Sequence, residues 1–181
     1  SMNYLRIYVY SLLILFVSLV AADQISKNIA LLYLPHDKEV LHGGLFSLHL
    51  IFNSDTFLVK IEDPFNLGPS GTYKYIYLSL SAFLTAAIIF TTTFLNKKTT
   101  VFPIRIITLG LLFILAGIWG NAIDHATRFG VVDFIRYNNE NTIPIFNFAD
   151  VFVWIGEFFL FGGLAVFLLN NKYRGLLEKR I

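Results

Sequence analysis

Two aspartates stand in apolar surroundings beside a long hydrophobic run over residues 151–171. Asp133 lies in the sequence Val-Val-Asp-Phe, and Asp150 ends the sequence Phe-Asn-Phe-Ala-Asp immediately before the run. A charge at the edge of a hydrocarbon layer is costly, so a residue that carries one there is a candidate for function. These two carboxyl groups are therefore the first candidates for chemistry in this chain.

Two carboxyl groups about 3 Å apart cannot both ionise comfortably, so they share one proton. The ionised group is then a general base for a water molecule, while the protonated group hydrogen-bonds a substrate carbonyl and later protonates the leaving amine. The connecting loop is long enough to bring Asp133 and Asp150 together. The pair predicts hydrolysis of an amide without a metal, a cofactor or a nucleophilic side chain.

Both aspartates also have structural interpretations. Asp150 stands where a helix would begin, and aspartate is a preferred N-cap, although Asn147 could do the same work. Asp133 could be a solvated loop residue, but its apolar neighbours make such a position unusual. From the residues alone, capping or solvation remains an alternative to catalysis at each position.

Further charged residues accompany the pair. Asp23 and Lys27 are one helical turn apart and are expected to form an ion pair. Asp124 and His125 could join the two aspartates in a site for a hard cation. We favour the interpretation without a bound metal, in which the carboxyl groups act directly.

The composition predicts a membrane protein. Of the 181 residues, 56% are hydrophobic and only 14% are charged, against about 25% charged in a soluble domain, and the mean hydropathy is +0.65. The chain has no cysteine, which excludes disulfides and thiolate sites. The net charge is only +2 and no basic stripe is present, so nucleic acid is not an expected partner.

Four apolar segments are candidates for transmembrane helices, because a helix needs about 20 residues to cross the hydrocarbon core. The first could instead be a signal peptide, with Arg6 before it and small residues at 21–22, but the other segments argue for a multi-pass protein. We predict a single all-α integral membrane domain over 1–181, a four-helix transmembrane bundle with helices over about 7–33, 73–96, 104–124 and 148–171.

The basic residues predict the orientation. They cluster at the end of the bundle that holds both termini, which should therefore be cytoplasmic. The acidic residues expected at the opposite, outer face are Asp23, Asp124, Asp133 and Asp150.

Between the first two helices, alternating apolar and polar residues at 46–50 predict a strand, and the glycines at 43–44 predict a turn. A small β-cradle is expected within the insertion over 36–72.

Five motifs, in this order, resemble those of the lipoprotein signal peptidases, the type II signal peptidases of bacteria. They are Ala-Asp-Gln-Ile-Ser-Lys at 22–27, Asn53, Gly-Asn-Ala-Ile-Asp at 120–124, Val-Val-Asp-Phe at 131–134 and Phe-Asn-Phe-Ala-Asp at 146–150. Each motif alone is weak, but the five in sequence are specific. The resemblance implies a four-helix aspartyl protease of the bacterial cytoplasmic (inner) membrane with a periplasmic β-cradle.

The resemblance also implies the substrate and the roles of residues. The substrate would be a diacylglyceryl-modified prolipoprotein, cut just before the lipidated cysteine by a monomer that is surrounded by membrane phospholipid. Asp133 and Asp150 would be catalytic. The residues expected to bind substrate or support the site are Asp23, Lys27, Asn53, Asn121, Asp124, His125, Arg128 and Asn147.

This chain departs from the pattern of those peptidases at two places. Asp55 stands two residues after Asn53, where the pattern has a glycine, and His125 follows Asp124, where the pattern has arginine. Arg128, one helical turn on, is placed to substitute for that arginine. These changes leave open a catalytically inactive relative that binds lipidated precursors.

A small proton-coupled transporter is the other alternative, because Glu157 is the only charge within the run over 151–171. It falls on the helical face of Asp150 and Trp154, and we expect it to face the bundle interior. The second and third predicted helices carry no ionisable residue across their cores, which argues against a proton pathway.

Overall fold

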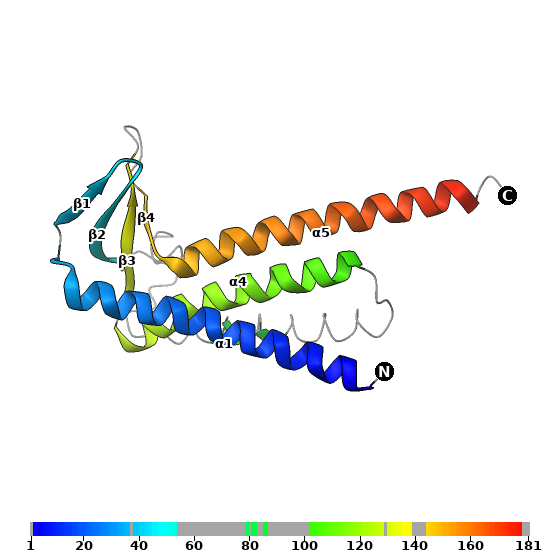
Figure 1. Ribbon diagram of the computed structural model, residues 1–181, viewed down its shortest axis with the longest axis horizontal. Coiled ribbons are helices and arrows are strands. Elements are labelled where there is room, and N and C mark those ends of the chain that lie inside the picture. Colours follow the sequence, from blue (N-terminus) through cyan, green and yellow to red (C-terminus); the bar gives the residue numbers. More distant parts are fainter. Residues whose placement is uncertain are drawn as a thin grey trace, which may run out of the picture.

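A computed structural model describes residues 2–36, 38–53, 79, 81–82, 85–86, 102–128, 130–138 and 144–178. In chain order its elements are α1 (Met2–Tyr33), β1 (Glu39–Gly43), β2 (Phe46–Asn53), α4 (Phe102–Thr127), β3 (Val131–Tyr137), β4 (Ile145–Phe146) and α5 (Phe148–Glu178). The helices run lengthwise beside one another, and the sheet lies at one end of them (Figure 1). Both termini lie at the other end.

Among the described residues, three helices are long and apolar enough to cross a membrane. They cover Arg6–Tyr33, Phe102–Thr127 and Phe148–Asn170. Large apolar side chains are exposed along α1 and α5, for example Ile14 and Leu168, as expected for surfaces that face lipid. Most of the helix predicted over 73–96 lies outside the described residues. The long apolar helices and the small antiparallel sheet fit a membrane protein.

The α4 and α5 helices pack at backbone distance because glycines face each other. A Cβ atom built on Gly110 would lie 2.6 Å from the backbone nitrogen of Leu160, and one built on Gly156 would lie 2.6 Å from the carbonyl oxygen of Gly110. Small residues permit such close approach between membrane helices. A Cβ atom built on Gly117, nearer the end of α4, would overlap the carbonyl oxygen of Ala149, so the close packing continues to the start of α5, where the acidic residues gather.

The sheet is antiparallel, with strand order β1-β2-β3-β4. The strand predicted at 46–50 is β2 and extends to Asn53, and the predicted turn contains Gly44 with a φ of 70°, a conformation that glycine adopts readily. A bulge interrupts the β2–β3 pairing between Leu48 and Ile51. The sheet therefore includes residues from two separate parts of the chain.

The solvated-loop interpretation of Asp133 was wrong, because Asp133 lies within β3 and is 3% exposed. Strand side chains alternate between faces. Val132 and Phe134 point to one face, where they are buried with Ala30 of α1 and Leu50. Asp133 points to the other face. The side chains on one face of β3 therefore anchor the strand on α1, and the opposite face presents the carboxyl group of Asp133.

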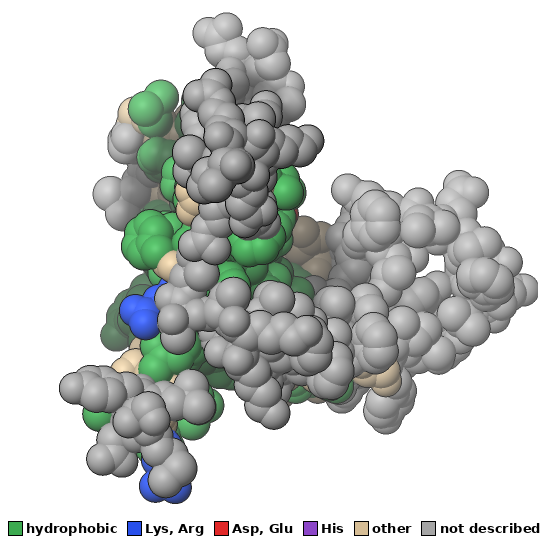
Figure 2. Space-filling model, turned by 90° about the vertical axis from the view of Figure 1, so that its right-hand side faces the viewer, with side chains coloured by type: hydrophobic (Ala, Val, Ile, Leu, Met, Phe, Trp, Pro, Cys, Tyr) green, Lys and Arg blue, Asp and Glu red, His purple; other side chains and the backbone are tan. Residues whose placement is uncertain are grey.

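Figure 2 looks at the end of the helices opposite the sheet. Lys and Arg side chains are visible on this face, and none of the described side chains visible there is acidic. The described residues at this end include Arg6 and Arg105, which are exposed, and Arg105 lies 6.0 Å from the centre of the Tyr8 ring. The two ends of the molecule thus differ in charge as well as in fold.

The glycine contact yields a test of the helix packing. Gly156→Ala should lower the free energy of unfolding by about 1–3 kcal/mol, because the added methyl group meets backbone atoms of α4 that cannot move aside. The measurement is thermal unfolding of the purified protein in detergent.

Gly162→Ala is the matched control on the same helix, because a Cβ atom there meets nothing within 4 Å. It should leave the stability unchanged or raise it by up to about 1 kcal/mol, since alanine favours helix. Equal stability of the two variants would contradict the packing argument.

Candidate functional site

The carboxyl group of Asp133 is buried and accepts two hydrogen bonds. Its Oδ2 accepts from Nδ2 of Asn53 at 3.0 Å, and its Oδ1 accepts from Nδ2 of Asn147 at 2.7 Å. Asn53 comes from the end of β2, the strand paired with β3. The strand pairing therefore places one of the two donors, and the segment before α5 places the other.

Asp150 lies in the first turn of α5, where Asn147 is the residue before the helix. Oδ1 of Asn147 accepts from the backbone nitrogen of Asp150 at 3.1 Å, and Oδ2 of Asp150 accepts from the backbone nitrogen of Asn147 at 3.0 Å. This is a reciprocal capping box. Asn147 is thus the N-cap, and one carboxyl oxygen of Asp150 accepts from the backbone nitrogen of Asn147. The other carboxyl oxygen of Asp150, Oδ1, accepts from Nδ2 of Asn121 at 3.1 Å.

Asn147 connects the two aspartates. Its side-chain nitrogen donates to Asp133, and its backbone nitrogen donates to Asp150. Since its Oδ1 is committed to the helix start, its Nδ2 must face Asp133. Asn147 itself is fully buried, so these bonds are made out of contact with solvent. One residue thus hydrogen-bonds both of the carboxyl groups that the sequence singled out.

The environment of Asp133 favours its protonated form. Burial raises the pKa of this carboxyl from 3.8 to about 7, although the hydrogen bond from Asn53 lowers it. The negative charge of Asp150 raises the pKa further. The surroundings of Asp133 therefore favour its protonated form more than water does.

A fully buried ammonium group lies behind the pair. Nζ of Lys27 lies 2.8 Å from Oδ2 of Asp23 and 2.9 Å from Oδ2 of Asp124, and it donates to Oδ1 of Asn121 at 2.9 Å. All three residues that carry charge are 0% exposed. The ion pair predicted between Asp23 and Lys27 is confirmed. Because the ammonium group only donates, it turns the oxygen of Asn121 inward and leaves the nitrogen to donate to Asp150.

The two carboxylates that hold Lys27 also hold the backbone beside the candidate pair. Oδ1 of Asp23 accepts from the backbone nitrogen of Ala149 at 2.9 Å, and Oδ2 of Asp124 accepts from the backbone nitrogen of Val132 at 3.1 Å. Each of these nitrogens belongs to the residue immediately before a candidate catalytic aspartate. The buried ions therefore fix the positions of β3 and the start of α5.

Arg128 closes this network at the end of α4. It pairs with Asp124, donates to Oε1 of Gln24 at 2.9 Å and donates to Oδ1 of Asn28 at 2.8 Å. It thus contacts the carboxylate of the residue that precedes His125, and its substitution for the arginine of the pattern stays a prediction. His125 is half-buried on the same helix. Asp55, the other departure, lies outside the described residues.

Gln24, which lies within the motif at 22–27, and Asn28 were not among the residues expected to support the site. Nε2 of Gln24 donates to Oδ1 of Asp124 at 3.0 Å and to the carbonyl oxygen of Gly120 at 2.9 Å. Gln24 and Asn28 are four residues apart on α1, beside Lys27, so helical spacing was the signal that could have identified them.

The structure also bears on Glu157 and on the cation site. Glu157 is exposed, so the expectation that it faces the bundle interior was wrong. The packing face of α5 is set by the buried Phe152 and Gly156, and Glu157 lies about 100° around the helix from Gly156. Within the part of the chain that the structure describes, no group of three acidic or histidine side chains has the geometry to hold a metal ion.

Comparison with known proteins gives a family. The sequence profile of signal peptidase (SPase) II matches residues 15–166. The chain is 31% identical over 161 residues to a lipoprotein signal peptidase of Chlamydia muridarum, which covers 86% of this chain and 91% of the relative. It is 29% identical over 158 residues to a lipoprotein signal peptidase of Acinetobacter baumannii, which covers 86% of this chain and 84% of the relative.

Two solved structures of bacterial membrane enzymes, both obtained by the in meso method, share the fold. One has a TM-score of 0.67 at 19% identity and covers 91% of each chain. The other has a TM-score of 0.68 at 20% identity and covers 87% of this chain and 94% of the other. The profile match extends over most of the sequence, and the chain therefore belongs to the signal peptidase II family.

Proposed function

We propose that this protein removes signal peptides from diacylglyceryl-modified prolipoproteins, and that it does so as an aspartic endopeptidase that cuts just before the lipidated cysteine. Asp133 and Asp150 are the catalytic residues in this proposal. The observation that carries it is the bridge of Asn147 between two buried or half-buried carboxyl groups, in a chain of the signal peptidase II family.

The proposed mechanism assigns a different role to each aspartate. Ionised Asp150 takes a proton from a water molecule, and the resulting hydroxide attacks the carbonyl carbon of the scissile bond. Protonated Asp133 hydrogen-bonds the carbonyl oxygen and then gives its proton to the leaving amine as the C–N bond breaks. The raised pKa of Asp133 supports this division of roles. No metal, cofactor or covalent intermediate takes part.

The remaining site residues position the pair. Asn53 and Asn147 direct N–H groups at Asp133, and Asn121 directs one at Asp150. Donors fixed in advance do not have to reorient during the reaction, which is the main advantage of such a site over water. We assign His125 and Arg128, with Asp23, Lys27 and Asp124 behind them, to the support and the mouth of the site.

We further propose how the chain lies in the membrane. It is one domain over 1–181 with four transmembrane helices, the second over about 73–96. A β-cradle, to which the insertion over 36–72 contributes β1 and β2 and the later chain contributes β3 and β4, lies at the periplasmic face of the bacterial cytoplasmic membrane. Both termini are cytoplasmic and the site is periplasmic. The positive end opposite the sheet supports this orientation (Figures 1 and 2). The partners are the prolipoprotein and membrane phospholipid, not nucleic acid, and the protein acts as a monomer.

The exposed position of Glu157 weighs against the transporter alternative, because a proton relay would need that carboxyl group inside the bundle. A catalytically inactive relative would keep the same fold and the same network. Activity of the purified protein separates that alternative from the proposed enzyme.

The first prediction concerns the two aspartates. Purified wild-type protein should cleave a diacylglyceryl-modified prolipoprotein in the presence of EDTA, and Asp133→Asn and Asp150→Asn should each lose about 10³-fold or more in kcat, since neither amide can exchange the required proton. Cleavage is followed by gel mobility of the product.

Glu157→Gln is the matched control, because it removes a carboxyl group from an exposed position on the same helix as Asp150. It should cleave at the wild-type rate, and all three variants should unfold at similar temperatures. An active Asp133→Asn variant, or a wild type that needs added metal, would rule out the proposed mechanism.

The second prediction is a pH dependence. Asp133 must be protonated to act, so kcat/KM should fall as the pH rises through about 7, the pKa of this carboxyl. The hydrogen bond from Asn53 lowers that pKa. Asn53→Ala removes the bond, and the alkaline limb of the profile should therefore move to higher pH even if the maximal rate falls. A limb that stays in place or moves to lower pH would assign the proton to another group.

The third prediction is the orientation. The chain has no native cysteine, so single cysteines report their side of the membrane without background. Leu45→Cys, in the exposed turn between β1 and β2, should react with a membrane-impermeant maleimide added to cells with a permeabilised outer membrane. Arg6→Cys, exposed at the other end, should react only after the inner membrane is opened. The reverse pattern would invert the proposed topology.

A further inference from the structure

An apolar groove of about 580 Å³ lies between the sheet and the start of α5. Its walls present only apolar surface. The strands β2 and β3 contribute Phe46, Ile135 and Tyr137, and β4 and α5 contribute Phe146, Val151 and Trp154. A groove this large and this apolar is unusual beside a cluster of buried charges, so its occupant must be apolar too.

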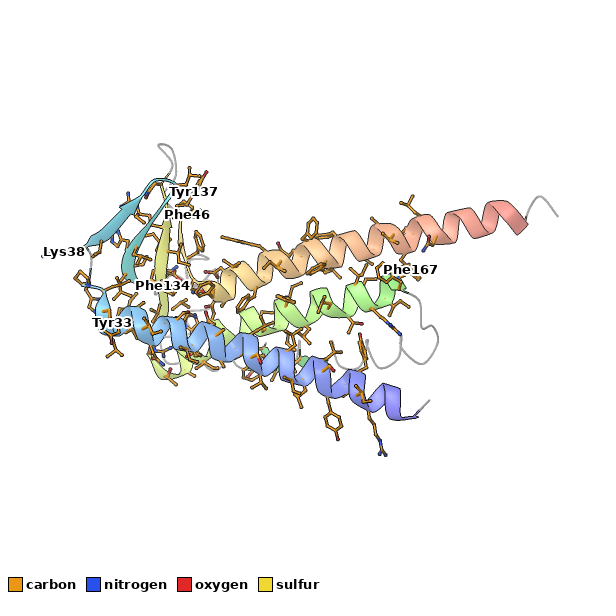
Figure 3. All side chains as sticks on the ribbon, viewed as in Figure 1. Tyr33, Lys38, Phe46, Phe134, Tyr137 and Phe167 are labelled. Carbon is orange, nitrogen blue, oxygen red and sulfur yellow. The ribbon has the colours of Figure 1, made fainter. Side chains whose placement is uncertain are left out.

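One wall of the groove lies on the face of the sheet that carries Asp133. Strand side chains alternate, so Ile135 and Tyr137 lie on the same face of β3 as Asp133. Their cross-strand partners Phe46 and Phe146 share that face. Figure 3 shows Phe46 and Tyr137 close together on the sheet, and their ring centres are 5.5 Å apart. On β3 the groove therefore begins at Ile135, two residues from Asp133, and runs along the strand away from it.

The other wall begins at Asp150. Val151 follows it directly, and Trp154 is one helical turn further along α5. The Trp154 ring also packs against Phe146, with ring centres 5.1 Å apart, which joins the helix to the edge of the sheet. Each wall of the groove thus begins within two residues of a proposed catalytic aspartate.

At its far side the groove meets the lipid-facing surface of α5. Trp154 is 52% exposed, and further along the helix Phe158 and Phe161 are 75% and 66% exposed. These side chains belong to the apolar surface that the membrane covers in a membrane-embedded protein. An acyl chain can therefore pass from the bilayer into the groove without crossing a polar surface.

We propose that this groove holds an acyl chain of the diacylglyceryl group on the substrate cysteine, an assignment that rests on the proposed function. The cut falls just before that cysteine, so its glyceryl thioether lies a few bonds from the reacting carbonyl. An acyl chain leaving the site toward the bilayer needs an apolar path that starts near the two carboxyl groups, and this groove supplies one. The groove spares the chain exposure to water where it leaves the bilayer for the site, a cost that would grow with each exposed methylene.

Fluorescence quenching tests the occupant directly. The chain has two tryptophans, so Trp119→Phe leaves Trp154 as the only one. Combined with Asp150→Asn, which stops turnover, it gives a stable complex with a diacylglyceryl lipopeptide whose acyl chains are brominated. In detergent micelles, equimolar lipopeptide should quench Trp154, and an excess of unbrominated lipopeptide should reverse the quenching.

Brominated phosphatidylcholine at the same mole fraction is the comparison. It should quench Trp154 weakly, since the groove is proposed to select the substrate. Equal quenching by phospholipid and lipopeptide would show that bulk lipid fills the groove, and absence of quenching by the lipopeptide would show that its chains lie elsewhere. Either result overturns the proposal without affecting the proposed function.

Kinetics give an independent test that leaves Asp150 intact. Trp154→Ala should raise KM about tenfold for a substrate with hexadecanoyl chains and leave it unchanged for one with butanoyl chains, with kcat unaltered. Comparing variant with wild type on the same substrate cancels differences in micelle partitioning. Trp154→Phe should restore most of the loss, and Phe161→Ala, a lipid-facing control outside the groove, should behave as wild type.

The outcomes distinguish a failure of the acyl-chain assignment from a failure of the proposed function. An equal rise in KM for long and short chains would remove the acyl-chain assignment while leaving the peptidase intact. If the wild type cleaves neither substrate, the proposed function fails, and the quenching experiment still decides whether the groove binds the lipopeptide.

Discussion

The ammonium group of Lys27, buried between the carboxylates of Asp23 and Asp124, is the interaction on which the site depends. A buried charge without a partner costs several kcal/mol, so none of the three can be removed alone without destabilising the others. Together they join α1 to α4. Each carboxylate also holds a backbone nitrogen next to a proposed catalytic aspartate, one in β3 and one at the start of α5. A strand and a helix that are distant in sequence are thereby fixed relative to each other by one ion cluster.

This arrangement explains why few groups near the pair are free to move. Asn147 starts α5 and bridges both aspartates with the same amide, so forming the helix and orienting Asp133 are one event. Asn121 is turned by Lys27 and can only donate to Asp150. Supporting residues that are themselves locked by hydrogen bonds keep a site within the narrow geometric range that catalysis requires. The cost of burying so many polar groups is offset because every one of these amides has a partner.

Much of this could be predicted from the sequence, and the exceptions have physical causes. The membrane character, the ion pair at the end of α1 and the strand at 46–50 depend on composition and local spacing, which are visible in one dimension. The strand β3 was missed because Asp133 interrupts an otherwise apolar segment, although its β-branched and aromatic residues favour a strand. The bridging role of Asn147 and the outward position of Glu157 depend on how β3, α4 and α5 pack together, which local spacing does not show. Helical spacing alone shows which residues share a face, but the glycine contacts at Gly156 decide which face is buried.

The bulge in β2 shows how one backbone irregularity connects the site to the groove. Phe46 pairs with Tyr137 and Asn53 pairs with Val131, so both lie on the face of β3 that carries Asp133. Phe46 and Asn53 are seven positions apart, an odd offset, and in a regular strand the two would point to opposite faces. The extra residue between Leu48 and Ile51 restores the match, which is a recognised use of bulges next to active sites. Without it, the strand could hold the Asp133 carboxyl group or form the wall of the groove, but it could not do both.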